Sequence, residues 1–565
     1  MKKFTALMLA LVMCFSLFAG CSSEEETTTA APAGDTTTAA PSGETTTAAP
    51  AEGPVEIVTA TNTTFATLDP ALMSTTAMSA VYAQTGANLF KTDVNGNYQN
   101  ELCESYELSE DSLTYTFKLK EGIKWSDGEP LTAEHCVFGI KRSIGYGPMN
   151  AYAARNLTSF IVGAAEAAEQ QMDVADMTEV GVNVIDDLTF EVKLLEPHPF
   201  FHKFFAGNVT APMRPDFAVE HESAWSVDGT IYPCLGAMKL ESISAEEQAV
   251  YVKNENYWNA ENVTLDKITW LVMPDSTAQL NAFKAGELDV ALNVPTEVST
   301  NAEYANMLYK GEKYTSTYFV LLNGGPKNTV PAFKDANVRK AMTLAINKPV
   351  MIEILGGGSE FIVQLDGFIP YGFAGLNDDF RAEASYHTYN LEEAKKLMEA
   401  AGYNENNRLK FEYLYSNSQF HADVAQMLQQ FWSAIYIDAE LKSVEGGVFY
   451  DFVDNGDFSA CRYANNDSSD PLNYFKIFTT DAQIDGCQSI RDDKYDQLVA
   501  EAYTITDQTK YIEKLHEIED YMVGEQSFVI PLFTQIPVVL VSENVQGFWT
   551  GVAGGPDFTS VTFAN

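Results

Sequence analysis

Two hydrophobic periods follow one another along most of this chain. In residues 113–119, apolar and polar side chains alternate strictly, which is typical of a half-buried strand. After Thr132, apolar side chains recur on one helical face at Ala133, Val137 and Ile140. Strands and helices that alternate in this way are typical of α/β folds. We therefore expect mixed sheets covered by helices.

The same alternation continues to about residue 400. Residues 55–60 and 288–291 have the patterns of strands. Several predicted helices, recognised by one apolar face, are preceded by residue types that cap helix N-termini. Helices are expected to begin at Asp275 or Ser276, at Asp335, and at Asn390, where Glu393 has capping-box spacing, and the last of them to end at Gly402.

The N-terminus has the pattern of a secretory signal. Two lysines precede an apolar run from Phe4 to Ala19, which is shorter than the roughly 20 residues of a membrane-spanning helix. An ordinary signal peptide cut near Gly20 is one interpretation. The Ala-Gly-Cys ending favours a lipoprotein signal, residues 1–20, with Cys21 as the lipid attachment site. We expect a chain anchored by lipid at the extracellular face of the cell membrane.

A repeat of nine residues follows Cys21. Thr-Thr-Thr-Ala-Ala-Pro begins at Thr27 and recurs from Thr36 and Thr45. Small polar residues with periodic proline cannot bury a core, so residues 21–54 are predicted to be a disordered tether. Whether its threonines carry glycans is left open.

The charge balance excludes one class of partner. The chain has 78 acidic and 35 basic residues, a formal net charge of −43. Such a chain repels phosphate backbones, so no nucleic-acid partner is expected. The acidity either favours cationic ligands or serves solubility.

Motifs of metal, redox, nucleotide and catalytic sites are absent or weak. His198 and His202 are four residues apart, but prolines beside them argue against a helical metal site. Gly356–Ser359 lacks the lysine of a P-loop, and no nucleophile elbow is present. We expect no cofactor, no metal and no enzymatic activity. No CxxC pair is present, and the sequence does not decide which cysteines form disulfides. Cys461–Cys487 is one candidate disulfide among Cys103, Cys136, Cys234, Cys461 and Cys487.

Several short blocks resemble, in order, those of the extracellular solute-binding protein family 5, the peptide- and nickel-binding group of ABC importers. The longest runs from Asn88 to Ser143 and includes the segment Gly122–Gly128. Two departures are His135-Cys136 and the turn at residues 232–237. The other matching blocks are Leu68-Asp69-Pro70, Asn254–Trp258, Phe283–Asp289, Val338–Ile346 and Glu393–Tyr403.

The resemblance implies a periplasmic-binding-protein-like type II clamp of the α/β class, with three lobes, two of which close on the ligand. Lobe II is inserted in lobe I, and the segment from Ile530 returns to lobe I. The implied boundaries are 55–96, 206–325 and 525–565 for lobe I, 97–205 for lobe II, and 326–524 for lobe III.

The resemblance also implies ligand contacts. Peptide-binding relatives have an acidic residue four before Pro471 that pairs with the ligand's α-amine, and Asp467 has this spacing. The other interpretation is that Asp467 and Asp470 cap a turn. Many relatives have Trp where this chain has Ala464, so a side-chain pocket is wider or the ligand is not a peptide.

Further contacts are implied on both sides of the ligand. Ser74, Thr75 and Thr76 are expected to face it from one lobe, and Asn466 and the backbone around Ala464 from the other. Tyr463 is expected to face the ligand or another lobe. Arg462 either receives a ligand carboxylate bidentately or is a surface arginine.

We therefore expect a monomeric substrate-binding lipoprotein that captures short peptides by backbone and termini. Its other partners are an ABC permease and ATPase complex. The alternatives are a binding protein for an oligosaccharide or a metal chelate, and a surface sensor or adhesin with the same fold.

Overall fold

The computed structural model describes most of the chain beyond the predicted tether. Residues Gly53–Asn565 form one compact unit. Five residues predicted to be functional lie outside the described residues: Cys21, Ser74, Thr75, Thr76 and Asp467. The described residues are 54–62, 64–65, 67–73, 82–93, 98–147, 157–220, 233–309, 316–356, 360–377, 379–466, 470–480, 490–550 and 555–564.

The largest sheet has seven strands, and its central strands come from distant parts of the chain. The predicted strand at residues 55–60 is β1, which runs parallel to β10 from Glu56↔Lys267 to Thr61↔Val272. Ile57, Tyr251 and Trp270 are buried on one of its faces. In spatial order the strands are β12 (Leu308–Tyr309), β19 (Val539–Val541), β11 (Val290–Ala291), β1 (Glu56–Thr61), β10 (Lys267–Val272), β9 (Gln248–Lys253) and β8 (Met238–Ser244).

A four-stranded antiparallel sheet carries the strand predicted at residues 113–119. That strand is β5, and the helix predicted after Thr132 is α2 (Ala133–Gly145). The apolar stripe of α2 packs with Tyr115 and Phe117 of β5 in one core. The spatial order is β4 (Cys103–Leu108), β5 (Thr114–Leu119), β7 (Thr189–Lys193) and β6 (Val182–Asp186).

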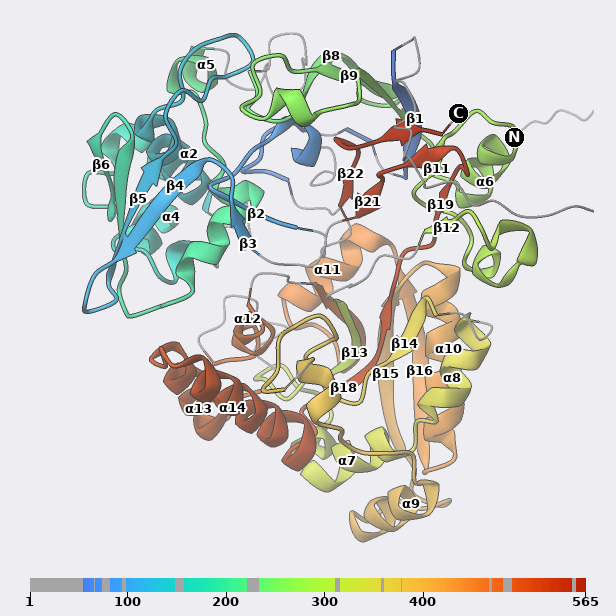
Figure 1. Ribbon diagram of the computed structural model, residues 1–565. Coiled ribbons are helices and arrows are strands. Elements are labelled where there is room, and N and C mark those ends of the chain that lie inside the picture. The colour runs from blue at the N-terminus through green and yellow to red at the C-terminus, as the bar shows by residue number, and fades with distance from the viewer. Residues whose placement is uncertain are drawn as a thin grey trace, which may run out of the picture. The chain divides into compact units, whose positions relative to one another are not determined.

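The third large sheet is mixed and has six strands (Figure 1). Its helices begin at predicted caps: Asp335 before α7 and Asn390 before α9 each accept a backbone N–H at their side chain. The spatial order is β14 (Ile362–Gln364), β18 (Val529–Gln535), β13 (Ser316–Leu322), β17 (Ala460–Asn466), β15 (Leu409–Ser416) and β16 (Ile437–Val444), with α7 (Ala336–Leu344), α8 (Lys348–Gly356), α9 (Leu391–Ala400), α10 (Gln419–Ser433) and α11 (Gly446–Asp454) around it.

Short sheets and helices complete the described residues. Asp275 caps α6 as expected, since its Oδ1 accepts the Ala278 N–H at 2.7 Å. The remaining helices include α4 (Ala164–Gln170), α5 (Pro215–Glu220), α6 (Ser276–Lys284), α12 (Leu472–Lys476), α13 (Asp493–Tyr503) and α14 (Gln508–Glu519), and the remaining strands are β2 (Phe90–Thr92), β3 (Tyr98–Asn100), β20 (Val545–Gln546), β21 (Trp549–Thr550), β22 (Pro556–Asp557) and β23 (Thr562–Phe563).

Two strands depart from the predicted lobe boundaries. The boundaries assign β13 and β18 to lobe I, but both lie inside the six-stranded sheet, paired from Tyr318↔Phe533 to Leu321↔Val529. Backbone hydrogen bonds between distant segments decide sheet membership, and hydrophobic period alone does not reveal them. The division into three lobes stays a prediction.

The fold class is the one expected from the alternating periods: mixed α/β sheets covered by helices. Among the described residues, no helix is both long and apolar enough to cross a membrane.

Candidate functional site

β17 has one edge that no described strand pairs with along most of its length. It pairs with β13 from Ala460↔Leu322 to Asn466↔Ser316. On its other side it pairs with β15 only at Ala460 and Cys461. From Arg462 onward, β13 is therefore its only strand partner among the described residues. The outer backbone groups of this stretch can pair with an extended ligand.

The end of β17 is also a point where the chain changes faces of the sheet. β15 and β17 are parallel neighbours. After β15 the chain enters α10, whose Val424 and Trp432 pack on one face. After β17 it enters α12, whose Tyr474 and Phe475 belong to the core of the opposite face. Ligands of open α/β sheets bind beyond the carboxyl ends of strands at such a switch point. In Figure 1, α11 lies at this end of the sheet and α9 at the other.

Arg462 projects at this switch point and is buried, with 6% of its surface exposed. Its Nη2 donates to Ser416 Oγ at 2.6 Å, which joins β17 to the end of β15. Its guanidinium carbon lies 4.2 Å from the centre of the Phe449 ring and 5.7 Å from that of Tyr450, both on α11. The prediction of a surface arginine is therefore wrong, because α11 covers the side chain.

A histidine that is neutral at pH 7 lies close enough to the arginine to sense its charge. Nδ1 of His421, in the first turn of α10, is 3.0 Å from the Tyr318 hydroxyl. Burial and, to a smaller extent, the positive charge of Arg462 together lower the pKa of His421 to about 4. At neutral pH the ring is uncharged, so Arg462 supplies the positive charge of this group. Sequence reasoning did not single out Ser416, His421, Phe449 or Tyr450, although Ser418 is a cap residue directly after an apolar strand.

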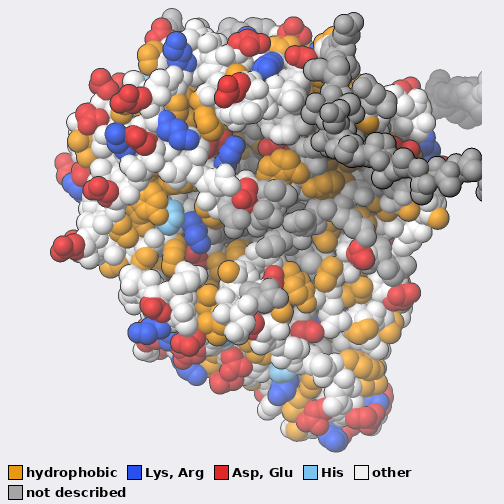
Figure 2. Space-filling model, in the orientation of Figure 1, with side chains coloured by type: hydrophobic (Ala, Val, Ile, Leu, Met, Phe, Trp, Pro, Cys, Tyr) orange, Lys and Arg blue, Asp and Glu red, His pale blue; other side chains and the backbone are white. Residues whose placement is uncertain are grey.

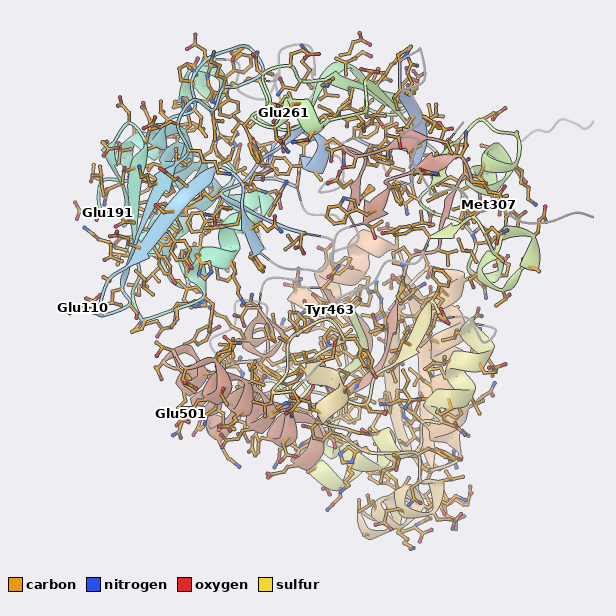
Figure 3. All side chains as sticks on the ribbon, viewed as in Figure 1. Glu110, Glu191, Glu261, Met307, Tyr463 and Glu501 are labelled. Atoms are coloured by element: carbon orange, nitrogen blue, oxygen red, sulfur yellow. The ribbon has the colours of Figure 1, made fainter. Side chains whose placement is uncertain are left out.

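The other predicted contacts on β17 lie along the open edge. Tyr463 is half-buried, and its ring packs edge-on against Phe319 at 5.7 Å. Ala464 is exposed and faces Tyr318 in the register, while Asn466 ends the strand opposite Ser316. Figure 3 shows Tyr463 near the end of the sheet where α11 lies. The structure thus brings Arg462, Tyr463, Ala464 and Asn466 together at one strand end, and their contact with a ligand stays a prediction.

Asp470 follows the segment that contains Asp467. Its Oδ1 accepts the Leu472 N–H at 2.9 Å and also the Tyr511 hydroxyl. Its Oδ2 lies 3.9 Å from Nζ of Lys203. Asp470 therefore caps the turn before α12, as one interpretation of the sequence proposed.

Asp69 anchors the segment that leads toward Ser74. Its two oxygens accept from Arg142 of α2 at 2.8 and 2.6 Å. The Tyr146 hydroxyl donates to the same carboxylate at 3.2 Å. This buried ion pair fixes the Leu-Asp-Pro block against the four-stranded sheet region.

His198 is surrounded by aromatic rings. Its ring lies 4.7 Å from that of Phe160 and 5.1 Å from that of Tyr503. Burial lowers its pKa to about 3, as does the nearby charge of Lys476. The part of the chain that the structure describes contains no cluster of three or more metal-ligating side chains.

Comparisons with known proteins agree with this architecture. A family model described as bacterial extracellular solute-binding proteins, family 5 middle, matches residues 97–486. The periplasmic oligopeptide-binding protein of Escherichia coli is 26% identical over 494 residues, 85% of this chain and 87% of its own. A second protein of that organism, named as a probable deoxycholate-binding periplasmic protein, is also 26% identical, over 503 residues, 85% of this chain and 88% of its own.

Solved structures show the same fold. The Haemophilus influenzae oligopeptide-binding protein, in complex with the peptide RPPGFSPFR, superposes with a TM-score of 0.73 at 24% identity. The match covers 91% of this chain and 100% of that one.

Proposed function

Since this chain belongs to the bacterial extracellular solute-binding proteins of family 5, we propose that it captures short peptides outside the cell for an ABC importer. In this proposal Cys21 carries the lipid that anchors the chain, residues 21–54 are the tether, and a membrane permease receives the peptide. The curated relative from E. coli that is named for oligopeptide binding supports this ligand class.

The observation that carries the proposal is the strand pairing of β17, whose only strand partner from Arg462 onward is β13 among the described residues. A peptide that adds to this edge as a strand gains backbone hydrogen bonds that do not depend on its side chains. Exposed Ala464 leaves room beside that strand, where bulky side chains of different ligands fit. An importer for peptides of varied sequence needs this kind of recognition.

Asp467, which directly follows β17, is the proposed partner of the ligand's α-amine. A carboxylate that loses water needs a cation, and the charged hydrogen bonds of an ammonium group supply it. Ser74, Thr75 and Thr76 are proposed to contact the peptide from the opposite side.

On the face shown in Figure 2, basic side chains lie among acidic ones rather than forming one broad basic surface.

The test compares a tripeptide with its N-acetylated form by isothermal titration calorimetry. Loss of one charged hydrogen-bonded pair weakens binding by roughly 10- to 100-fold. We expect this loss for the acetylated peptide on the native protein, and for the free peptide on Asp467→Asn. The exposed Asp176 of the four-stranded sheet region offers the matched control, Asp176→Asn, which should bind as the native chain does.

Equal affinity for both peptides contradicts the role of Asp467. Native mass spectrometry of the protein from its own host tests the ligand class: a co-purified peptide supports the proposal, and a sugar, bile acid or metal chelate contradicts it.

A further inference from the structure

We propose that Phe160 and residues 198–203, on one side, and Asp470 with α12–α14, on the other, form a latch that is closed at neutral pH and that protonation of His198 opens. The latch adds no contact with the ligand and so goes beyond the proposed function. It rests on that function only in its last step, in which a bound peptide favours the closed latch.

The first argument is that aromatic side chains join two regions that share no sheet. No described strand of the four-stranded sheet pairs with a strand of the six-stranded sheet. Instead, the ring of His198 lies 5.1 Å from that of Tyr503 on α13, and the ring of Phe200 lies 4.9 Å from that of Tyr511 on α14. In Figure 1, these helices lie below the four-stranded sheet. A contact of this kind can open while the hydrogen bonds of each sheet stay intact.

The second argument is that two lysines act across the contact. Nζ of Lys476, on α12, lies 3.6 Å from the centre of the Phe160 ring. Nζ of Lys203 lies 3.9 Å from Oδ2 of Asp470, a buried oxygen without a hydrogen-bond partner among the described residues. Both attractions join the two sides and favour the closed latch.

The third argument is that the closed latch excludes a charged histidine. His198 is 3% exposed, and its ring lies 4.7 Å from that of Phe160. Neither of its ring nitrogens has a hydrogen-bond partner among the described residues. A protonated imidazole carries a charge and two N–H donors, and burial among aromatic rings stabilises neither.

The charges around His198 also oppose its protonation. Burial and, to a smaller extent, the positive charges of Lys476, His202 and Lys203 lower the pKa of His198 to about 3. The other titratable side chains that adjoin His198 or this contact are Tyr115, Tyr503, Tyr511 and Asp470. A ring released into water returns to the ordinary pKa of 6.5, so below that pH the open latch binds more protons than the closed latch. Acidification therefore opens the latch.

The fourth argument is that the latch holds the link that follows β17. β17 ends at Asn466 and α12 begins at Leu472, so Asp470 lies in the link between them. Asp467, the proposed partner of the α-amine, precedes Asp470 by three residues. An open latch withdraws Lys203 from this link. A ligand that binds the link in its present position therefore favours the closed latch.

The test measures side-chain exposure in the full chain by hydroxyl-radical footprinting at pH 7 and pH 5. One proton on His198 shifts the equilibrium toward the open latch by about 25-fold over this range. We expect the modification of Tyr503 and Tyr511 to rise by at least about fivefold. Tyr251 in the seven-stranded sheet and Tyr413 in the six-stranded sheet are buried and should stay protected at both pH values.

Three variants identify the group that titrates. His198→Leu should abolish the rise, because an apolar side chain fills the same surroundings without binding a proton. The matched control His202→Leu removes a second buried histidine, whose ring stacks on that of Tyr106 at 4.7 Å, and it should keep the rise. Lys203→Met should increase the modification at both pH values and leave its pH dependence unchanged.

Equal modification of Tyr503 at both pH values, or a rise that His198→Leu retains, overturns the inference. A rise of the same size at Tyr251 also overturns it, because general unfolding then explains the exposure.

The link to the ligand is tested with a saturating tripeptide, whose binding calorimetry at pH 5 establishes first. The peptide should lower the modification of Tyr503 at pH 5. A peptide that binds and leaves this modification unchanged overturns the link between latch and ligand. A native chain that binds no tripeptide contradicts the proposed function alone, since footprinting tests the latch on the free protein.

Discussion

At the scale of single residues, a buried ion pair holds two segments of the described chain together. The carboxylate of Asp69 is 2% exposed and has three donors from Arg142 and Tyr146. A buried ion pair of this kind adds little to the free energy of unfolding compared with an apolar pair of the same volume. Removal of one partner, however, leaves the other charge buried and unpaired.

Arg142→Met is therefore expected to lower the free energy of unfolding by about 3–5 kcal/mol, measured by urea denaturation. Arg408 is a matched control, because its contact with Asp438 at 2.7 Å lies at the surface. Arg408→Met should cost at most about 1 kcal/mol. An equal loss in both variants would show that Asp69 finds water or another partner when Arg142 is removed.

At the scale of elements, β17 pairs with β13 along its whole length but with β15 only at Ala460 and Cys461. If a peptide adds to the outer edge, the backbone N–H groups of the ligand donate to β17 carbonyls, or its carbonyls accept from β17 N–H groups. The bond that a ligand N–H donates is lost if that amide carries a methyl group, whereas the ligand carbonyl can still accept.

We expect N-methylation of one inward-facing amide of a tripeptide to weaken binding by roughly 5- to 10-fold, the value of one neutral hydrogen bond. Methylation of the amide that faces away from β17 is the matched control and should have little effect. Calorimetry with both peptides checks the orientation, and equal affinities would contradict strand addition.

Local patterns predicted the elements well, and long-range contacts explain what they missed. Asn390 caps α9, and Gly402 follows it with φ of +91°, as the sequence indicated. The sheet membership of β13 and β18, and the burial of Arg462 by α11, depend on segments far apart in the chain. The family resemblance pointed to residues 462–467, whereas Ser416 and His421 became visible only when β15 lay beside β17.

At the scale of the whole molecule, buried histidines link stability to pH. His198 lies where the four-stranded sheet region meets α13, with Lys476 3.6 Å from the centre of the nearby Phe160 ring. Its folded-state pKa of about 3 lies below the ordinary 6.5. Between these values the unfolded chain binds more protons than the folded one, so stability falls as pH falls. His135, His202 and His421, each with a pKa of about 4, act in the same direction.

Glu101 acts in the opposite direction, because burial raises its pKa from 4.5 to about 7 and the folded state then binds the extra proton. Its contribution is lost as pH rises from 4.5 to 7, but four histidines outweigh one glutamate. We expect the urea midpoint to fall between pH 7 and pH 5. The free energy of unfolding should fall over the same pH range, and its decrease should be smaller by about 2 kcal/mol in His198→Leu, at about 1.4 kcal/mol per pH unit for one proton. An unchanged decrease would contradict the assignment to His198.

The open edge of β17 has a consequence for the empty protein. A strand edge that no neighbouring strand covers can pair with a strand from a second copy of the chain. In the proposed complex, the bound peptide covers this edge of β17 and so prevents self-association through it. The ligand would then keep the protein soluble as well as being transported. Protein purified without ligand is expected to aggregate more.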